Sequence, residues 1–385
     1  MDIQPYTISV SPYIIEDLRE RLGRARWPDE ITDSGWEYGA NLHYLRDLCT
    51  HWGHGFEWKK QEEILNGFHH FQARVDDFGL HFIHEKGKGH HRMPILLIHG
   101  WPDSIVRFLK IIPLLTDRVA EGLSFDVVVP SIPGFGFSEK PSSRGMNPEK
   151  IAGLFAGLMK DLGYERYLVH GGDWGSTIAE ELAIRFPDRL IGLHLTDVPY
   201  RLRLAVRPSD PSQAERAFFE QFQQWQQQEG AYSQEQGTKP QTLAYGLNDS
   251  PIGLAAWIIE KFYSWTDCNG NLESVYSRDE LLTNLTIYWV TQTAGSAARI
   301  YYERNHHLRP WKGQRIEIPT AFFICSRDLV PAPREFAERL FMVKQWTSSP
   351  RGGHFAAMEQ PRLLAEDIFR FAEKYAGQPV TQAAS

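Results

Sequence analysis

The sequence has few cysteines, no long apolar run and no excess of basic charge, and each shortage excludes a class of protein. The 385 residues include three cysteines, Cys49, Cys268 and Cys325, whose wide spacing excludes a C-x-x-C site and fits a reducing compartment. No run approaches the roughly 18 apolar residues of a membrane-spanning helix. The opening residues, MDIQPYTISVSPY, lack the basic and apolar segments of a secretory signal. The sequence therefore predicts a soluble, cytoplasmic protein without a membrane anchor.

The charge balance and the composition exclude further classes. Lys and Arg number 41 against 48 Asp and Glu, a formal net charge of −7 with neutral histidines, which argues against nucleic acid as a partner. No internal repeat or low-complexity segment occurs, so a solenoid or a disordered array is excluded. With 42% apolar and 23% charged residues, a chain of this length can bury a core without disulfides or a metal.

From residue 78 onward, short apolar runs alternate with helical patterns near 103–118, 147–162 and 176–186. The runs are HFIHEKG, PILLIHG (94–100), FDVVVPSIPG (125–134), RYLVHGG (166–172), LIGLHLTDVP (190–199) and TAFFICS (320–326). Near-continuous apolar strands between helices are typical of an α/β protein whose parallel sheet is covered on both faces.

Two regions depart from this alternation. Before it, Ser11 and Pro12 predict the start of a helix, and the aromatic-rich stretch 27–71 is expected to be largely helical. Residues 201–313 read as a helical insertion. We therefore predict an N-terminal extension over 1–90, an α/β core over 91–200 and 314–376, a helical insertion over 201–313 and a tail over 377–385.

A carboxylate stands where a strand turns sharply into a helix. The strand RYLVHGG leads into Asp173, flanked by Gly171 and Gly175, in the pattern of a nucleophile elbow. A carboxylate is a poor acyl nucleophile because its mixed anhydride reverts, but it can displace a leaving group at sp³ carbon and form an ester. The competing interpretation is that Asp173 only caps the helix.

Hydrolysis of such an ester needs a base, an acid that orients the base, and donors for the oxyanion. Asp328 follows the strand TAFFICS, and His354 follows two glycines in RGGHFAAMEQP, in the chain order that nucleophile-elbow enzymes use. His354 would deprotonate water and Asp328 would orient the imidazole. The backbone amides of Trp101 and Trp174 are the candidates for the oxyanion hole.

These segments together resemble the epoxide hydrolases of the α/β-hydrolase superfamily, on the branch of the microsomal and fungal enzymes. The resemblance extends over nearly the whole chain and includes LRERLGRARWPDE, FEWKKQEEILNGF, HGWPDS, PSIPGFGFSEKP, GGDWGS, TKPQTLAYGLNDSPIGLAAWIIEKF, YYERN and RGGHFAAMEQP. It implies an α/β-hydrolase fold with a helical lid, and an N-terminal domain that wraps around core and lid. It also implies conversion of an epoxide to a vicinal diol, with no metal or organic cofactor.

The resemblance further implies two lid tyrosines that hydrogen-bond the epoxide oxygen. Segment by segment they fall on Tyr232 and Tyr302, with Tyr301 and Tyr245 as the alternatives. A phenol, whose reference pKa is about 10, can donate a proton to the opening ring while it is neutral.

Other functions and the substrate stay open at this point. A haloalkane or haloacid dehalogenase would share Asp173 and His354 and could hold halide with the indoles of Trp101 and Trp174. A hydrolase-like binding protein without turnover is a second alternative, whereas a serine esterase is disfavoured by the aspartate. The aromatic lid suggests a lipophilic or aryl epoxide. Detoxification and natural-product synthesis are both compatible with this chemistry, and an exposed lid is compatible with a homodimer.

Overall fold

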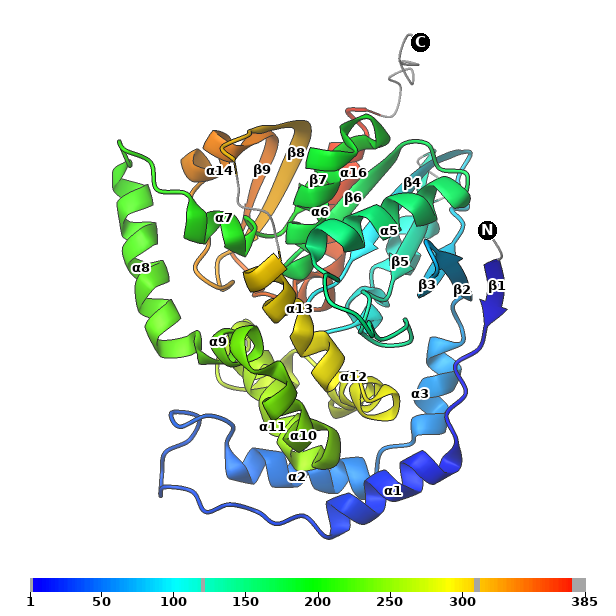
Figure 1. Ribbon diagram of the computed structural model, residues 1–385, viewed down its shortest axis with the longest axis vertical. Coiled ribbons are helices and arrows are strands. Elements are labelled where there is room, and N and C mark those ends of the chain that lie inside the picture. The colour runs from blue at the N-terminus through cyan, green and yellow to red at the C-terminus, as the bar shows by residue number, and fades with distance from the viewer. Residues whose placement is uncertain (1–2, 119–121, 308–311, 376–385) are drawn as a thin grey trace.

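The computed structural model describes residues 3–118, 122–307 and 312–375. The predicted tail 377–385 lies outside the described residues. A central sheet occupies the upper half of Figure 1, and a group of helices lies beneath it. This arrangement confirms the predicted α/β architecture.

The central sheet is mostly parallel. In spatial order its described strands are β1 (Ile3–Tyr6), β2 (His70–Val75), β3 (Phe78–Glu85), β5 (Leu123–Pro130), β4 (His91–Ile98), β6 (Tyr167–Gly171), β7 (Leu190–Leu195), β8 (Ile316–Cys325) and β9 (Phe341–Ser349). From β5 to β9 every pairing is parallel, while β1, β2 and β3 add an antiparallel edge. The carboxyl ends of the parallel strands therefore meet at one side of the sheet.

Helices cover both faces of the sheet, so the central strands are buried on both. Alternate residues of β4 point to opposite layers: Leu96 and Ile98 join one core cluster, Ile95 and Leu97 the other. The first cluster includes α5 (Pro148–Asp161), α6 (Trp174–Arg185) and α14 (Arg334–Leu340). The second includes η1 (Ile105–Phe108), α4 (Ile112–Thr116) and α16 (Pro361–Ala372). This two-sided burial explains why these strands read as continuous apolar runs.

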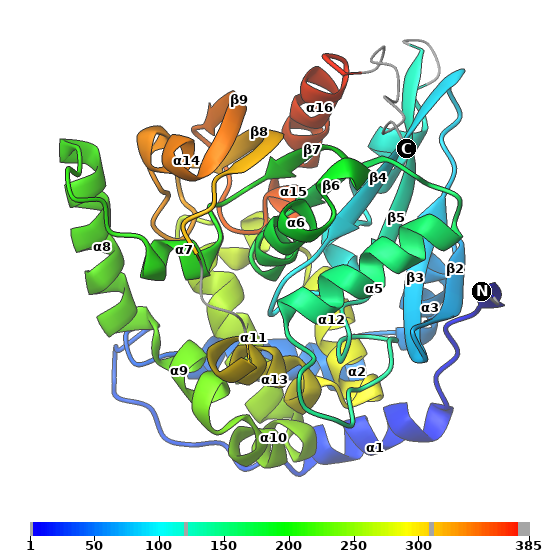
Figure 2. The same cartoon turned by 45° about the horizontal axis from the view of Figure 1, so that its top comes forward.

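A helical lid covers the carboxyl ends of the strands. Its elements are α7 (Tyr200–Ala205), α8 (Gln213–Glu229), α9 (Ala231–Thr238), α10 (Pro240–Asp249), α11 (Pro251–Trp265), η3 (Leu272–Ser274), α12 (Arg278–Thr291) and α13 (Ala294–His307). Figures 1 and 2 show α9, α10 and α13 grouped below the sheet, with α8 standing at its side. The lid thus lies over the edge of the sheet at which the parallel strands end.

The first two N-terminal helices lie beneath the lid, on the side away from the sheet, and the third lies beside the lid, below β2 (Figure 1). These helices are α1 (Pro12–Gly23), α2 (Leu42–His54) and α3 (Trp58–Leu65). Arg21 Nη1 donates to Asp249 Oδ1 on α10 at 2.6 Å, and the buried indole of Trp52 donates to Thr286 Oγ1 on α12 at 2.9 Å. Since β1 precedes α1 and β2 follows α3, the same segment binds the lid and the sheet edge at once.

Some predicted local structure was wrong. The stretch 27–71 is helical only over α2 and α3, and much of the rest forms turns. The strands β1, β2 and β9 were not predicted, because they lie at or near the sheet edges, where burial on one face gives no continuous apolar run. Ser11 does stand at the N-cap of α1, although its side chain makes no capping bond.

Candidate active site

The elbow holds Asp173 in a backbone conformation that non-glycine residues rarely adopt. Its φ is 57° and its ψ is −122°, directly between β6 and α6. Such conformations cost of order 1–3 kcal/mol and cluster at functional sites. Asp173 does stand at the N-cap of α6, but its side chain makes no capping bond, so capping alone does not account for the carboxylate. Instead, Trp101 N donates to Asp173 Oδ1 at 2.8 Å, and His354 Nε2 lies 3.6 Å from Oδ2.

Glycines make this turn possible because other chain segments approach it closely. A Cβ atom on Gly175 would lie 2.1 Å from the carbonyl oxygen of Ile98, and one on Gly171 would lie 2.5 Å from the backbone of Gly175. Both glycines belong to the elbow pattern predicted from the sequence. A Cβ atom on Gly100 would lie 2.4 Å from Asp173 Oδ1, so the loop after β4 also needs glycine to reach the carboxylate.

His354 is buried and points one ring nitrogen at each of two carboxylates. Its Nδ1 lies 2.8 Å from Asp328 Oδ1. Its Nε2 faces Asp173 and has no hydrogen-bond partner within the described part of the chain. Burial lowers the pKa of His354, but the charges of Asp328 and Asp173 outweigh burial and raise it to about 10. The imidazole is therefore protonated at neutral pH when both carboxylates are charged.

Asp197 and Arg203 lie behind these groups and were not found from the sequence. Asp197 Oδ1 accepts from the backbone N–H of Asp173 at 2.9 Å, and Arg203 Nη2 donates to Asp197 Oδ2 at 3.1 Å. Arg203 Nη1 also donates to the carbonyl of Leu329, next to Asp328. Burial raises the pKa of Asp197 to about 6, although the Arg203 charge opposes this. The sequence feature that could have identified Asp197 is its position near the end of the apolar run LIGLHLTDVP.

A second buried ion pair joins the loop after β4 to the loop of His354. Asp103 and Arg107 form this pair, and both side chains are buried. Gly100 N donates to Asp103 Oδ1 at 2.9 Å, and Arg107 Nη2 donates to the carbonyl oxygen of His354 at 2.6 Å. The segment that presents the Trp101 amide is thus fixed relative to the imidazole.

One carboxylate, Glu359 at the end of α15 (Ala356–Glu359), fixes the loop of His354 to the lid. It accepts from the backbone N–H of Gly353 at 2.8 Å, of Phe355 at 2.9 Å and of Asp267 at 3.0 Å. The N–H of His354 itself donates to the carbonyl of Trp265 in the lid at 2.8 Å. Burial raises the pKa of Glu359, while the three N–H bonds lower it.

The lid contributes two tyrosines, and one of them differs from the prediction. Tyr232 on α9 and Tyr301 on α13 line the pocket, whereas Tyr302 lies outside it and stacks on His306 with centroids 3.9 Å apart. One residue along a helix turns the side chain by about 100°, so the neighbouring tyrosine faces away. The assignment to Tyr302 is therefore corrected to Tyr301. Tyr245 is 72% exposed on α10 and is excluded.

Rings hold the lid tyrosines in place. Tyr232 stacks on Trp101 with centroids 5.2 Å apart and planes 7° apart, and Tyr301 meets Trp174 edge to face at 4.7 Å. Burial raises the pKa of both phenols well above the usual value, and the charge of Asp173 raises it further. Both side chains are therefore neutral proton donors at physiological pH.

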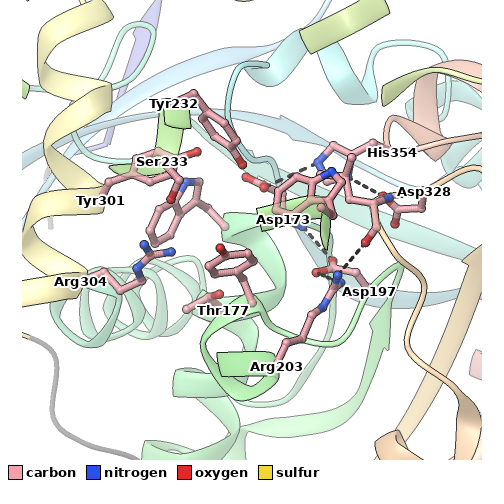
Figure 3. Close-up of a pocket in the computed structure, with 14 residues that line it drawn as sticks. Asp173, Thr177, Asp197, Arg203, Tyr232, Ser233, Tyr301, Arg304, Asp328 and His354 are labelled. Carbon is pink, nitrogen blue, oxygen red and sulfur yellow. Dashed lines mark hydrogen bonds and ion pairs between the residues drawn. The ribbon is translucent and has the colours of Figure 1, made fainter. Parts of the chain in front are cut away.

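The candidate residues converge on one pocket between the sheet edge and the lid (Figure 3). Its lining includes Asp173, Asp328, His354, Tyr232 and Tyr301. Trp101 borders it through its N–H and its stacked ring. No group of three or more His, Cys, Asp or Glu residues that could hold a metal occurs within the described ranges.

Comparison with known proteins assigns both parts of the chain. Residues 3–108 match the family described as epoxide hydrolase N terminus, and residues 93–361 match the alpha/beta hydrolase fold family. The chain is 37% identical over 401 residues to epoxide hydrolase 1 of Oryctolagus cuniculus, covering 96% of this chain and 88% of the relative.

Solved structures agree with these matches. The epoxide hydrolase of Aspergillus niger superposes with a TM-score of 0.86 at 30% identity, covering 97% of each chain. The juvenile hormone epoxide hydrolase of Bombyx mori superposes with a TM-score of 0.85 at 28% identity, covering 97% of this chain and 94% of that one. None of the helices in the described ranges has both the length and the apolarity that crossing a membrane requires.

Proposed function

The chain belongs to the epoxide hydrolase family, and we propose that it opens an epoxide through a covalent ester on Asp173. The observation that carries this mechanism is the convergence of a carboxylate, a carboxylate-bound imidazole and two neutral phenols on one pocket. Together they provide a nucleophile, a base and an acid.

In the first step, a carboxylate oxygen of Asp173 attacks an epoxide carbon and the C–O bond breaks. Tyr232 and Tyr301 hydrogen-bond the epoxide oxygen, and one of them transfers its proton to it. The product is a hydroxyalkyl ester of Asp173. The imidazole of His354, whose Nε2 lies 3.6 Å from Asp173 Oδ2, stands beside the carboxylate that attacks.

In the second step, His354 Nε2 takes a proton from water, and the resulting hydroxide attacks Cγ of Asp173. The oxyanion is stabilised by the amides of Trp101 and Trp174, and the diol leaves when the ester bond breaks. The Trp101 amide bonded to Asp173 Oδ1 supports this role. The ester also removes the negative charge of Asp173, which lowers the pKa of His354. The imidazole therefore returns its proton to the ionised tyrosine, which restores the phenol, and it is neutral when it takes a proton from water. As the ester bond breaks, the diol oxygen takes the remaining proton of the attacking water, which leaves Asp173 as a carboxylate and His354 protonated, as at the start.

The rings around Tyr232 and Tyr301 favour a lipophilic or aryl body for the substrate. A cytoplasmic location and a homodimer remain predictions from the sequence alone.

The His354→Gln variant tests the mechanism because it should form the ester and fail to hydrolyse it. The variant is mixed with styrene oxide and, separately, with a chloroalkane, and the intact protein mass is recorded before peptide mapping. Epoxide opening adds the whole substrate mass to Asp173, whereas dehalogenation adds the alkyl group without halide. An adduct on a residue other than Asp173 would overturn the proposed mechanism. So would the absence of any adduct with epoxides that the wild type converts to diols.

A further inference from the structure

Arg304 lines the active-site pocket and has no part in the proposed reaction. It lies on α13, three residues after Tyr301, so both side chains leave the same face of the helix. Figure 3 shows its guanidinium directed into the pocket, which Thr177 and Ser233 also line. A cation in this position needs an explanation, because the aromatic walls otherwise suit an uncharged epoxide.

The other charged groups of the pocket lining are already paired. Arg203 Nη2 lies 3.1 Å from Asp197 Oδ2. His354 lies between two carboxylates, with Nδ1 2.8 Å from Asp328 Oδ1 and Nε2 3.6 Å from Asp173 Oδ2. Within the described residues Arg304 has no acidic partner. Its hydrogen bond runs from Nε to the neutral Asn305 Oδ1 at 3.0 Å.

Three aromatic rings hold the guanidinium in place. Its central carbon lies 5.1 Å from the ring centroid of Trp174, 5.3 Å from that of Tyr200 and 5.5 Å from that of Tyr301. Cation–π contacts of this kind fix the position of the group and leave its charge in place. The N–H donors lie in the guanidinium plane and are suited to bidentate binding of a carboxylate.

We propose that Arg304 binds a carboxylate of the substrate, so that the preferred substrate is an epoxide with a lipophilic or aryl body and an anionic group. This inference rests on the proposed function, because it places the epoxide carbon at Asp173. The cation also offsets the repulsion that remains after Arg203 and His354 have partly neutralised the three pocket aspartates.

The test compares acids with their neutral amides. The probes are 3- and 4-carboxystyrene oxide and terminal epoxyalkanoates of increasing chain length, each with its primary amide. For at least one pair, we expect the wild type to have a kcat/KM about 10- to 100-fold higher for the acid, the size of a charge-assisted hydrogen bond. Added salt should reduce this preference.

Substitution then assigns the preference to one side chain. Arg304→Gln should remove the preference for the acid, so that the ratio of kcat/KM between acid and amide falls to about one, while Arg304→Lys should keep part of it. Arg299→Gln is the matched control, since it removes the same charge from the same helix outside the pocket lining.

Two results would overturn the inference without touching the proposed function. The first is a wild type that hydrolyses the amides and prefers none of the acids, a result that does not depend on any variant folding. The second is an Arg304→Gln variant that loses the same factor on acid and amide, which would mean that the cation acts on the reaction and not on the substrate anion. Failure of every epoxide to give diol would count against the proposed function itself.

Discussion

The two sides of the pocket are built by different forces. On the sheet side, hydrogen bonds fix the reacting groups. Asp197 holds the elbow, Glu359 holds the loop of His354, and Asp103 holds the loop after β4. On the lid side, ring packing places Tyr232 and Tyr301. Hydrogen bonds define an atom's position within tenths of an ångström, whereas ring contacts allow a range. The sheet side should therefore tolerate polar substitutions poorly, and the lid side should adapt more readily.

Asp173→Asn is the most severe test of the sheet side and has the largest expected effect. The amide keeps the shape but loses the nucleophile, so we expect diol formation to fall by about 10⁴-fold or more. The measurement is kcat/KM with styrene oxide. Peptide mapping then checks for slow deamidation to Asp, which would restore activity with time. Residual activity near the wild-type level in freshly prepared variant would exclude Asp173 as the nucleophile.

On the lid side, the contrast between adjacent tyrosines should be large. Tyr301→Phe removes a proton donor while keeping the ring, so we expect the rate of ester formation to fall by about 10²- to 10⁴-fold. Tyr302→Phe should stay within about threefold of the wild type, since that ring lies outside the pocket. Stopped-flow measurement of the first turnover distinguishes the two variants. Equal losses would contradict the placement of Tyr301.

Glu359→Gln tests how far the rate of ester hydrolysis depends on the hydrogen bonds that hold the loop of His354. The amide would turn N–H donors toward the backbone N–H groups of Gly353 and Asp267, or toward that of Phe355, and either choice loses acceptors. We expect ester hydrolysis to slow by about 10- to 100-fold and ester formation to change little. Accumulation of the ester during turnover, seen by mass, is the readout.

The matched control is Glu366→Gln, an exposed glutamate on α16. A Glu359→Gln variant that slowed both steps equally would point to general loss of structure.

The smallest expected effect concerns pH and stability. The pKa of His354 is raised in the folded state to about 10 from an unfolded value near 6.5. Its contribution to stability is therefore complete below about pH 6.5 and is lost as the pH rises through about 10. The difference in unfolding free energy between the wild type and His354→Gln, from urea titrations, should shrink over this range. A difference that grew with pH would contradict a protonated imidazole.

The same comparison explains what the sequence could predict. Asp173, Asp328 and His354 each lie at the end of an apolar strand or beside glycines, so neighbouring residues reveal them. Assigning the lid tyrosines requires knowing which face of a helix each one occupies. An error of one residue turns the predicted side chain by about 100°, and such an error led to Tyr302 in place of Tyr301. Asp197 also follows an apolar strand, but its bond to the Asp173 N–H, like the bonds of Glu359, involves backbone groups that no residue type reveals. Their roles needed the tertiary structure.

The path of the N-terminal segment has a thermodynamic consequence. The chain pairs with the sheet edge at β1, runs under the lid through α1 and α2, and returns through α3 to the sheet at β2. Opening the lid far enough to expose its underside would break the Arg21–Asp249 and Trp52–Thr286 contacts. The lid therefore cannot unfold while this segment stays in place. Core and lid should melt in a single calorimetric transition, so heat would inactivate the enzyme and unfold it at the same temperature.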